Sequence, residues 1–126
     1  MTENEISYAI RGCIFEVHNT LGPGLLESVY VEALMYELSL KGLKVKREVG
    51  IPVKYKNTNL PLGFRMDILV EGKVLIEVKS IETLLNVHHK TVLTYLSLAN
   101  LRLGILVNFN SSDIANSIYR KVNNLP

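Results

Sequence analysis

The sequence has one cysteine, no apolar run long enough to cross a membrane, and little net charge. The single Cys13 excludes an internal disulfide framework and a cysteine-based zinc site. No apolar stretch approaches the roughly 18 residues of a membrane span. The acidic N-terminus MTENEISYAIRG also lacks the pattern of a signal peptide. We therefore expect a cytoplasmic protein with no membrane partner.

The composition that is present suits one folded domain. Of the 126 residues, 48% are hydrophobic and 21% are charged, so the chain can form a core and does not have the composition of a disordered segment. The sequence shows no internal repeat, linker or low-complexity segment. It predicts a single domain over residues 1–126 and leaves open whether the chain acts as a monomer or a homodimer.

Positive charge is concentrated in one part of the chain. The net charge of +2 does not by itself predict a nucleic-acid partner, but six basic residues fall in one short stretch opposed only by Glu48. Such a patch could bind a phosphate backbone. Equally, charged side chains protect an exposed edge strand from pairing with other chains, and the sequence leaves both interpretations open. The six residues are Lys41, Lys44, Lys46, Arg47, Lys54 and Lys56.

Hydrophobic periodicity and turn signals predict a mixed α/β order. Helices are predicted at residues 4–18, at about Leu25–Leu40, at Leu84–Ala99 and at residues 112–122. Strands are predicted at Leu43–Glu48, Ile51–Tyr55, Phe64–Val70, Val74–Lys79 and Leu103–Phe109. The last of these strands is continuously apolar, as in strands that are buried on both faces. Because it follows a crossover helix, we expect a mixed sheet with at least one parallel pair.

The two strands joined by Glu71-Gly72-Lys73 carry a charge pattern with period two. Alternation places Asp67 on one face of its strand and Glu77 with Lys79 on one face of the next. If the loop has an odd number of residues, Asp67 lies directly across from Glu77; an even loop would mix the two faces. The opposite, apolar face would then carry Phe64, Met66, Ile68, Val70, Val74, Ile76 and Val78.

Carboxylates that face each other destabilise a sheet. A cation bound between Asp67 and Glu77 would remove this repulsion, and carboxylate oxygens suit a hard ion such as Mg²⁺. The alternative is a polar strand surface that faces solvent. However, Leu69 and Leu75 lie on the same face, so we expect it to be partly covered. The pattern therefore favours a metal site.

Glu27 lies among the apolar residues of the second predicted helix. At about 100° per residue, it projects near Tyr30, Val31 and Leu34, toward the interior or a cleft, where an unpartnered carboxylate is costly. It also lies in the first helical turn, where an acid interacts favourably with the helix dipole. Taken alone, Glu27 fits both a functional and a purely structural role.

These residues carry a resemblance. The segment Gly24-Leu25-Leu26-Glu27-Ser28-Val29-Tyr30 is similar to the signature of the GxxExxY family, which is grouped with the PD-(D/E)XK nuclease superfamily. The similarity extends from about residue 5 to residue 122. It includes Val17-His18, Leu21-Gly22-Pro23-Gly24, Arg65-Met66-Asp67, Glu77-Val78-Lys79, His88, Tyr95-Leu96 and Asn108-Phe109.

The resemblance implies a restriction-endonuclease-like core, in which helices flank a mixed central sheet. It also implies a metal-dependent nuclease that uses Mg²⁺ or Mn²⁺ and acts on nucleic acid. Asp67 and Glu77 would then be metal ligands, with the Val78 backbone carbonyl and the helix carboxylate Glu27 completing the set. Lys79 would position or activate the attacking water, so the implied catalytic residues are Glu27, Asp67, Glu77 and Lys79.

One position departs from the family pattern. Where this chain has Thr91, four residues before Tyr95-Leu96, relatives carry Gln, which helps to fix the site or the substrate strand. Its absence leaves the implied metal ligands in place but weakens the case for efficient catalysis. The alternative function is therefore a non-catalytic module on the same fold that binds nucleic acid or protein, because fold does not fix function.

Overall fold

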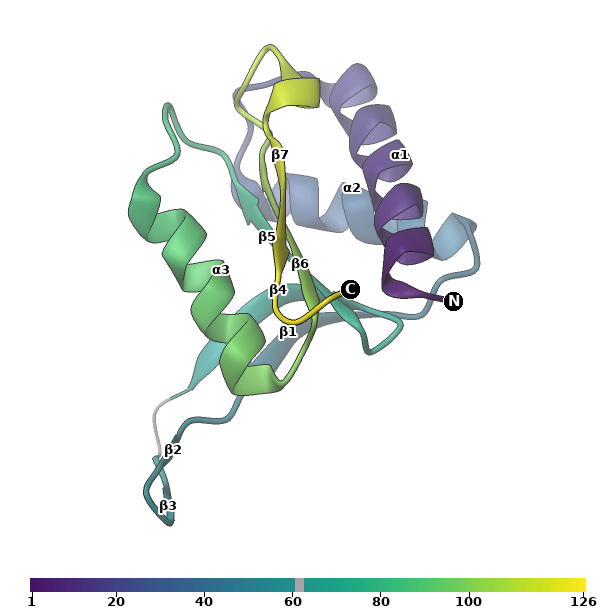
Figure 1. The fold of residues 1–126 in the computed structure, drawn as a ribbon. Coiled ribbons are helices and arrows are strands. Elements are labelled where there is room, and N and C mark those ends of the chain that lie inside the picture. Colours follow the sequence, from purple (N-terminus) through teal and green to yellow (C-terminus); the bar gives the residue numbers. More distant parts are fainter. Residues whose placement is uncertain (61–62) are drawn as a thin grey trace.

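The structure is a computed structural model that describes residues 1–60 and 63–126. Five strands form one mixed sheet in the order β1-β4-β5-β6-β7; helices α1 and α2 cover one face and α3 covers the other (Figure 1). The helices are α1 (Glu3–Leu21), α2 (Glu27–Leu40), α3 (Asn86–Ala99) and the short 3₁₀ helix η1 (Ile114–Asn116). The sheet contains β1 (Val45–Ile51), β4 (Phe64–Val70), β5 (Val74–Lys79), β6 (Leu103–Asn108) and β7 (Ile118–Val122). Strands β2 (Lys54–Tyr55) and β3 (Thr58–Asn59) form a separate two-stranded hairpin.

Helix α1 begins with a reciprocal cap. The Glu5 backbone N–H donates to the Thr2 hydroxyl, and the Thr2 backbone N–H donates to the Glu5 carboxylate, so two otherwise unpaired amides gain partners. Its apolar side chains at helical spacing are buried against the sheet, as the sequence predicts, and Cys13 is buried with them. The buried thiol is therefore part of the core.

The prediction for the hairpin of β4 and β5 is confirmed in both boundaries and register. The loop of Glu71, Gly72 and Lys73 is odd in length, and Val70 pairs with Val74, Leu69 with Leu75, and Ile68 with Ile76. Extending this register by one residue places Asp67 opposite Glu77. Strand β5 then pairs in parallel with β6, which is buried along its whole length, so the mixed sheet is confirmed as well.

The predicted faces of β4 are correct for one half of the strand and wrong for the other. Ile68 packs with α1 and α2, whereas Met66 packs with α3 and Phe64 contacts Tyr95 of α3. The cause lies beside Asp67: β1 and β4 pair on both sides of Glu48, which itself has a left-handed backbone (φ 52°). The alternation of the strand is therefore inverted at Asp67.

Two further predictions are wrong. Residues 112–122 do not form a helix, because after η1 the chain pairs antiparallel with β6 as β7, an edge strand. Ile114, Ile118 and Val122 are spaced by four, which fits a helix face and also alternate positions of a strand. In addition, β1 continues through Gly50 to Ile51, where the predicted second strand begins, and residues 54–55 pair with β3 instead.

The remaining boundaries agree with the sequence to within a few residues. Helices α2 and α3 each start two residues later than predicted. Both faces of the sheet carry a buried apolar cluster, and the face with α3 includes the fully buried Leu75. No helix in residues 1–60 and 63–126 is long and apolar enough to cross a membrane.

Candidate functional site

The structure brings two of the four predicted catalytic side chains into direct hydrogen-bonding contact with each other's strand. The Asp67 backbone N–H donates to Glu77 Oε1 at 3.0 Å, and the Val78 backbone N–H donates to Asp67 Oδ2 at 2.8 Å. The two carboxylates thus serve as acceptors at the point where the regular pairing of β4 and β5 ends. This exchange explains how two acids can lie next to each other within a sheet.

Burial weakens both carboxyl groups as acids, and nearby negative charges add to this effect. The side chain of Glu77 is 6% exposed, and its pKa rises from its ordinary value of 4.5 to about 8, first because of burial and then because of the Asp67 charge. Burial also raises the pKa of Asp67, although the Val78 N–H and the Lys79 charge oppose that rise. In the absence of a further cation, the pair therefore retains a proton near neutral pH.

Lys79 follows Glu77 by two residues and is half-buried. Its positive charge acts on both Asp67 and Glu77, opposing the rise in the pKa of each carboxyl. The Lys79 carbonyl accepts a hydrogen bond from the Phe109 backbone N–H at 2.9 Å, which fixes the end of β5 against the segment after β6. Lys79 is therefore held at the same end of the sheet as the two acids.

Glu27 is the first residue of α2 and approaches the site from another direction. The loop before it turns at Gly22 (φ 69°) and Gly24 (φ 95°), conformations that side chains other than glycine rarely adopt. The Tyr30 hydroxyl holds this loop, because it donates to the Gly22 carbonyl and accepts from the Leu25 N–H at 3.1 Å. Gly24 and Tyr30 of the motif thus fix the turn that positions Glu27 at the start of α2.

Once placed, Glu27 reaches the chain just beyond Lys79. Its Oε2 accepts a hydrogen bond from the Ser80 backbone N–H at 3.4 Å, and its charge contributes to the raised pKa of Asp67 and of Glu77. The ring of Tyr30 stacks on Phe109 with the ring centroids 4.5 Å apart. Glu27, Asp67, Glu77 and Lys79 therefore lie in one region of the molecule.

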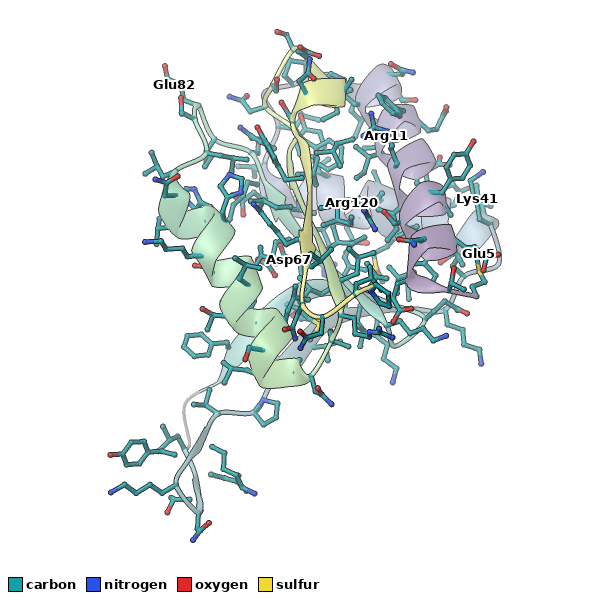
Figure 2. The ribbon with its side chains drawn as sticks, viewed as in Figure 1. Glu5, Arg11, Lys41, Asp67, Glu82 and Arg120 are labelled. Atoms are coloured by element: carbon teal, nitrogen blue, oxygen red, sulfur yellow. The ribbon has the colours of Figure 1, made fainter. Side chains whose placement is uncertain are left out.

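An open cavity of about 260 Å³ gives access to this region. Side chains of α2, β1 and β4 line it, and within this lining Arg47 forms an ion pair with Glu32 of α2. Asp67 lies in the body of the molecule, whereas Glu82 projects from the tip of the loop after β5 (Figure 2). The lining residues are Glu27, Ser28, Val31, Arg47, Glu48 and Asp67.

Sequence reasoning missed two residues that belong to the site. The buried Asn108 holds the loop after Lys79, because its side chain accepts from the Ile81 N–H at 3.1 Å and donates to the Ile81 carbonyl at 2.9 Å. Tyr95 of α3 packs with the apolar cluster on the face of the sheet that α3 covers. Burial, followed by the charges of Glu77 and Asp67, raises the pKa of Tyr95. A buried amide at the end of an apolar strand was the available signal for Asn108.

Thr91 lies one turn before Tyr95 on α3. Its hydroxyl donates to the Val87 carbonyl at 2.8 Å, so its single donor is used within the helix. Thr91 therefore does not replace the Gln that, in relatives, helps to fix the site or the substrate strand.

The chemistry of the paired carboxyls fits a divalent cation. The buried Glu77 and the half-buried Asp67, both with raised pKa values, supply the hard anionic oxygens that Mg²⁺ or Mn²⁺ prefers. In the part of the chain that the structure describes, however, no three His, Cys, Asp or Glu side chains form a ready-made cluster for an ion. A complete ligand set would therefore need Glu27, a backbone carbonyl or water in addition to the pair.

Comparison with known proteins places the chain in a family. Its sequence matches the family model of the PD-(D/E)XK nuclease superfamily over residues 4–121. The chain therefore belongs to the PD-(D/E)XK nuclease superfamily, and the mixed sheet flanked by three helices is consistent with its restriction-endonuclease-like fold. No curated protein matches the chain.

Proposed function

We propose that this chain is a metal-dependent nuclease of the GxxExxY type, which hydrolyses phosphodiester bonds in nucleic acid. The observation that supports the proposal most strongly is the pair formed by the half-buried Asp67 and the buried Glu77 beside Lys79. A folded protein gains no stability from two such adjacent acids, since burial opposes the ionisation of both and the Asp67 charge opposes that of Glu77. A bound divalent cation would stabilise the ionised form of both acids, which accounts for their being adjacent.

The ligands that we propose are the carboxylates of Asp67 and Glu77, the Val78 backbone carbonyl, and Glu27 from the rim of the cavity. The chemistry that such an ion supplies when bound is polarisation of a phosphoryl oxygen and a lower pKa for water. Asp67 and Glu77 are already held by backbone N–H groups, so neither needs to reorganise widely to present an oxygen.

The remaining groups of the site would act directly on the substrate. Lys79 places a positive charge beside the two acids, where it can hold a water molecule or stabilise charge that develops on the phosphate. The basic residues on β1, which include Lys46 and Arg47, lie on an edge strand beside β4. Lys46 and Arg47, the latter at the cavity itself, can contact the phosphate backbone of a bound strand.

Two observations favour the second candidate, a non-catalytic binding module on this fold. The described residues contain no ready-made three-ligand cluster, and the Thr91 hydroxyl is bonded back to its own helix. A binding module, however, would have no use for the proximity of Asp67 and Glu77. We therefore place the nuclease first.

The variant Lys79→Ala separates metal binding from catalysis. Lys79 supplies no anionic oxygen, so its removal should leave Mg²⁺ or Mn²⁺ affinity equal or higher. Loss of a preorganised cation should lower the cleavage rate by about 10²- to 10³-fold. Calorimetric metal titration and cleavage of labelled DNA and RNA, with EDTA as the blank, give the two measurements. Lys73→Ala, in the turn at the opposite end of β5, is the matched control.

Each outcome decides between the candidates. Wild-type cleavage by Lys79→Ala would show that any activity arises outside this site. If the wild-type protein binds neither metal ion and cleaves nothing, the nuclease proposal fails and the binding module takes its place. Equal losses of cleavage in Lys79→Ala and Lys73→Ala would point to a general change in charge.

A further inference from the structure

A second cavity lies beside the candidate active site, on the α3 side of the sheet. It has a volume of about 320 Å³ and is lined by Phe64, Lys90, Thr91, Thr94 and Tyr95; we call it the Phe64 groove. Its size falls at the lower end of the range for small-molecule pockets, about 300–1,000 Å³. No carboxylate is among its lining residues, and Lys90 gives its rim a positive charge.

Two aromatic rings form one wall of the groove. Phe64 is 44% exposed although it is a large apolar side chain, and its ring centroid lies 5.6 Å from that of Tyr95. The rings are tilted by 39° to each other, so Phe64 is not covered by a parallel partner. Phe64 turns toward α3 because the alternation of β4 is inverted at Asp67. An exposed ring next to a cation and without acids is suited to a flat, electron-rich ligand.

Tyr95 relates the groove to the two acids of the candidate active site. It lines the groove, and the charges of Glu77 and Asp67 contribute to the raised pKa of its hydroxyl, so the acids lie within electrostatic reach of this side chain. The Thr91 side chain, which also lines the groove, is short, and its hydroxyl donates to the Val87 carbonyl of the same helix. The groove is therefore near the two acids but is a separate cavity from the one lined by Asp67.

A hairpin arm starts at the same place. Phe64 pairs with Ile51, and the hairpin of β2 and β3, which we call the hairpin arm, extends away from the body of the molecule (Figure 1). The arm carries Tyr55, which is 60% exposed, with the Lys56 ammonium 5.5 Å from its ring centroid. Aromatic and cationic side chains therefore continue outward from the groove.

We propose that the Phe64 groove binds one unpaired base of a single-stranded nucleic acid, stacked on Phe64, with the rest of the strand directed along the hairpin arm. This inference rests on the proposed function, because it names the form of the substrate. Aromatic side chains beside positive charge are the usual means of holding single strands, since every base offers a face for stacking. In a duplex those faces are already covered by neighbouring bases, so the groove would discriminate against double strands.

The test is a binding measurement without cleavage. Fluorescence anisotropy in EDTA, with labelled oligo-dT, oligo-rU and a duplex of equal length, gives the three affinities and separates DNA from RNA. Phe64→Ala should weaken binding of the single strands by about 5- to 100-fold, which is the usual effect of losing one base–aromatic stack. Duplex affinity should change much less.

Two matched variants control for other effects. Phe64→Tyr keeps a ring and should retain single-strand affinity. Tyr8→Ala removes a tyrosine that is 83% exposed on α1, which covers the opposite face of the sheet, and should change no affinity. Because Phe64 is 44% exposed and lies outside the buried core clusters, Phe64→Ala should fold, and thermal melts of all variants verify this.

The outcomes distinguish this inference from the proposed function. If Phe64→Ala binds single strands as the wild type does, or loses single-strand and duplex affinity equally, the base-binding groove is refuted. Metal-dependent cleavage by the wild type would leave the nuclease proposal intact in that case. If the wild type neither binds nor cleaves any of the three nucleic acids, with Mg²⁺ or Mn²⁺ supplied for the cleavage assay, the nuclease proposal itself fails.

Discussion

Replacing Glu77 by Gln removes a buried acid while keeping a side-chain carbonyl oxygen that can accept the Asp67 N–H bond. In the folded protein the pKa of Glu77 is about 8, compared with an ordinary value of 4.5. Between these values the folded chain holds a proton that the unfolded chain has released, so folding takes up a proton. The stability of the wild type without metal should therefore fall as the pH rises through this window.

The size of the effect follows from proton linkage. One group contributes at most about 1.4 kcal/mol per pH unit. Between about pH 5 and about pH 7, Glu77 should thus lower the free energy of unfolding by no more than about 3 kcal/mol. For a chain of 126 residues, 1 kcal/mol corresponds to roughly 3–5 °C in Tm. Glu77→Gln should lack this contribution, so its Tm should rise relative to that of the wild type by up to about 15 °C over the same range.

The assay is thermal and urea unfolding in EDTA, followed by far-UV circular dichroism at a series of pH values. The matched control is Glu82→Gln, since Glu82 is exposed in the loop after β5 and should leave the pH profile unchanged. Parallel profiles for Glu77→Gln and the wild type would refute the reasoning. So would a variant that is less stable than the wild type at about pH 7, the end of this range at which the uptake of a proton on folding should cost most.

The same unfolding measurements can be repeated with a divalent cation in place of EDTA. A divalent cation binds deprotonated carboxylates, so its stabilising effect on the wild type should grow as the pH rises, opposite in sign to the trend in EDTA. Glu77→Gln should show a much smaller metal-dependent increase in Tm. An equal increase in both proteins would place the ion elsewhere.

Two further substitutions test the parts around this pair. Asp67→Asn in EDTA should stabilise the protein or leave it nearly unchanged, by a few tenths to about 1 kcal/mol, because it removes repulsion but keeps an acceptor for the Val78 N–H; a large drop in Tm would make Asp67 structural. Tyr30→Phe should cost about 1–3 kcal/mol, since the Leu25 N–H and the Gly22 carbonyl lose their partner. Chemical denaturation measures this cost, and Tyr36→Phe, which alters an exposed tyrosine of the same helix, should cost little.

The parts of the fold that local pattern determines could be predicted from the sequence. The hairpin of β4 and β5 follows from alternation and an odd loop, and the buried β6 follows from its continuous apolar run. The last segment could not be assigned, because spacing by four fits a helix and a strand alike. Residues 118–122 form a strand because they pair with the open edge of β6, a contact that the local sequence does not reveal.

The site likewise contains residues that local pattern identifies and residues that only tertiary contacts identify. Glu27, Asp67, Glu77 and Lys79 each stand out within their own element, so sequence patterns could select them. Tyr95 and Asn108 act across elements that are distant in the chain, and periodicity gives no information on such contacts. The inversion of β4 also escaped prediction, because it depends on a left-handed glutamate, Glu48, in the neighbouring strand.

The exchange of hydrogen bonds between β4 and β5 gives the site two intrinsic spectroscopic reporters. The amide protons of Asp67 and Val78 are each bonded to one of the two carboxylates. Their chemical shifts in NMR spectra will therefore respond to the ionisation of the pair, without substitutions at the site. Titration with acid or with a metal ion can then be followed at two positions in the unmodified protein, and the apparent pKa values that it gives belong to the coupled pair.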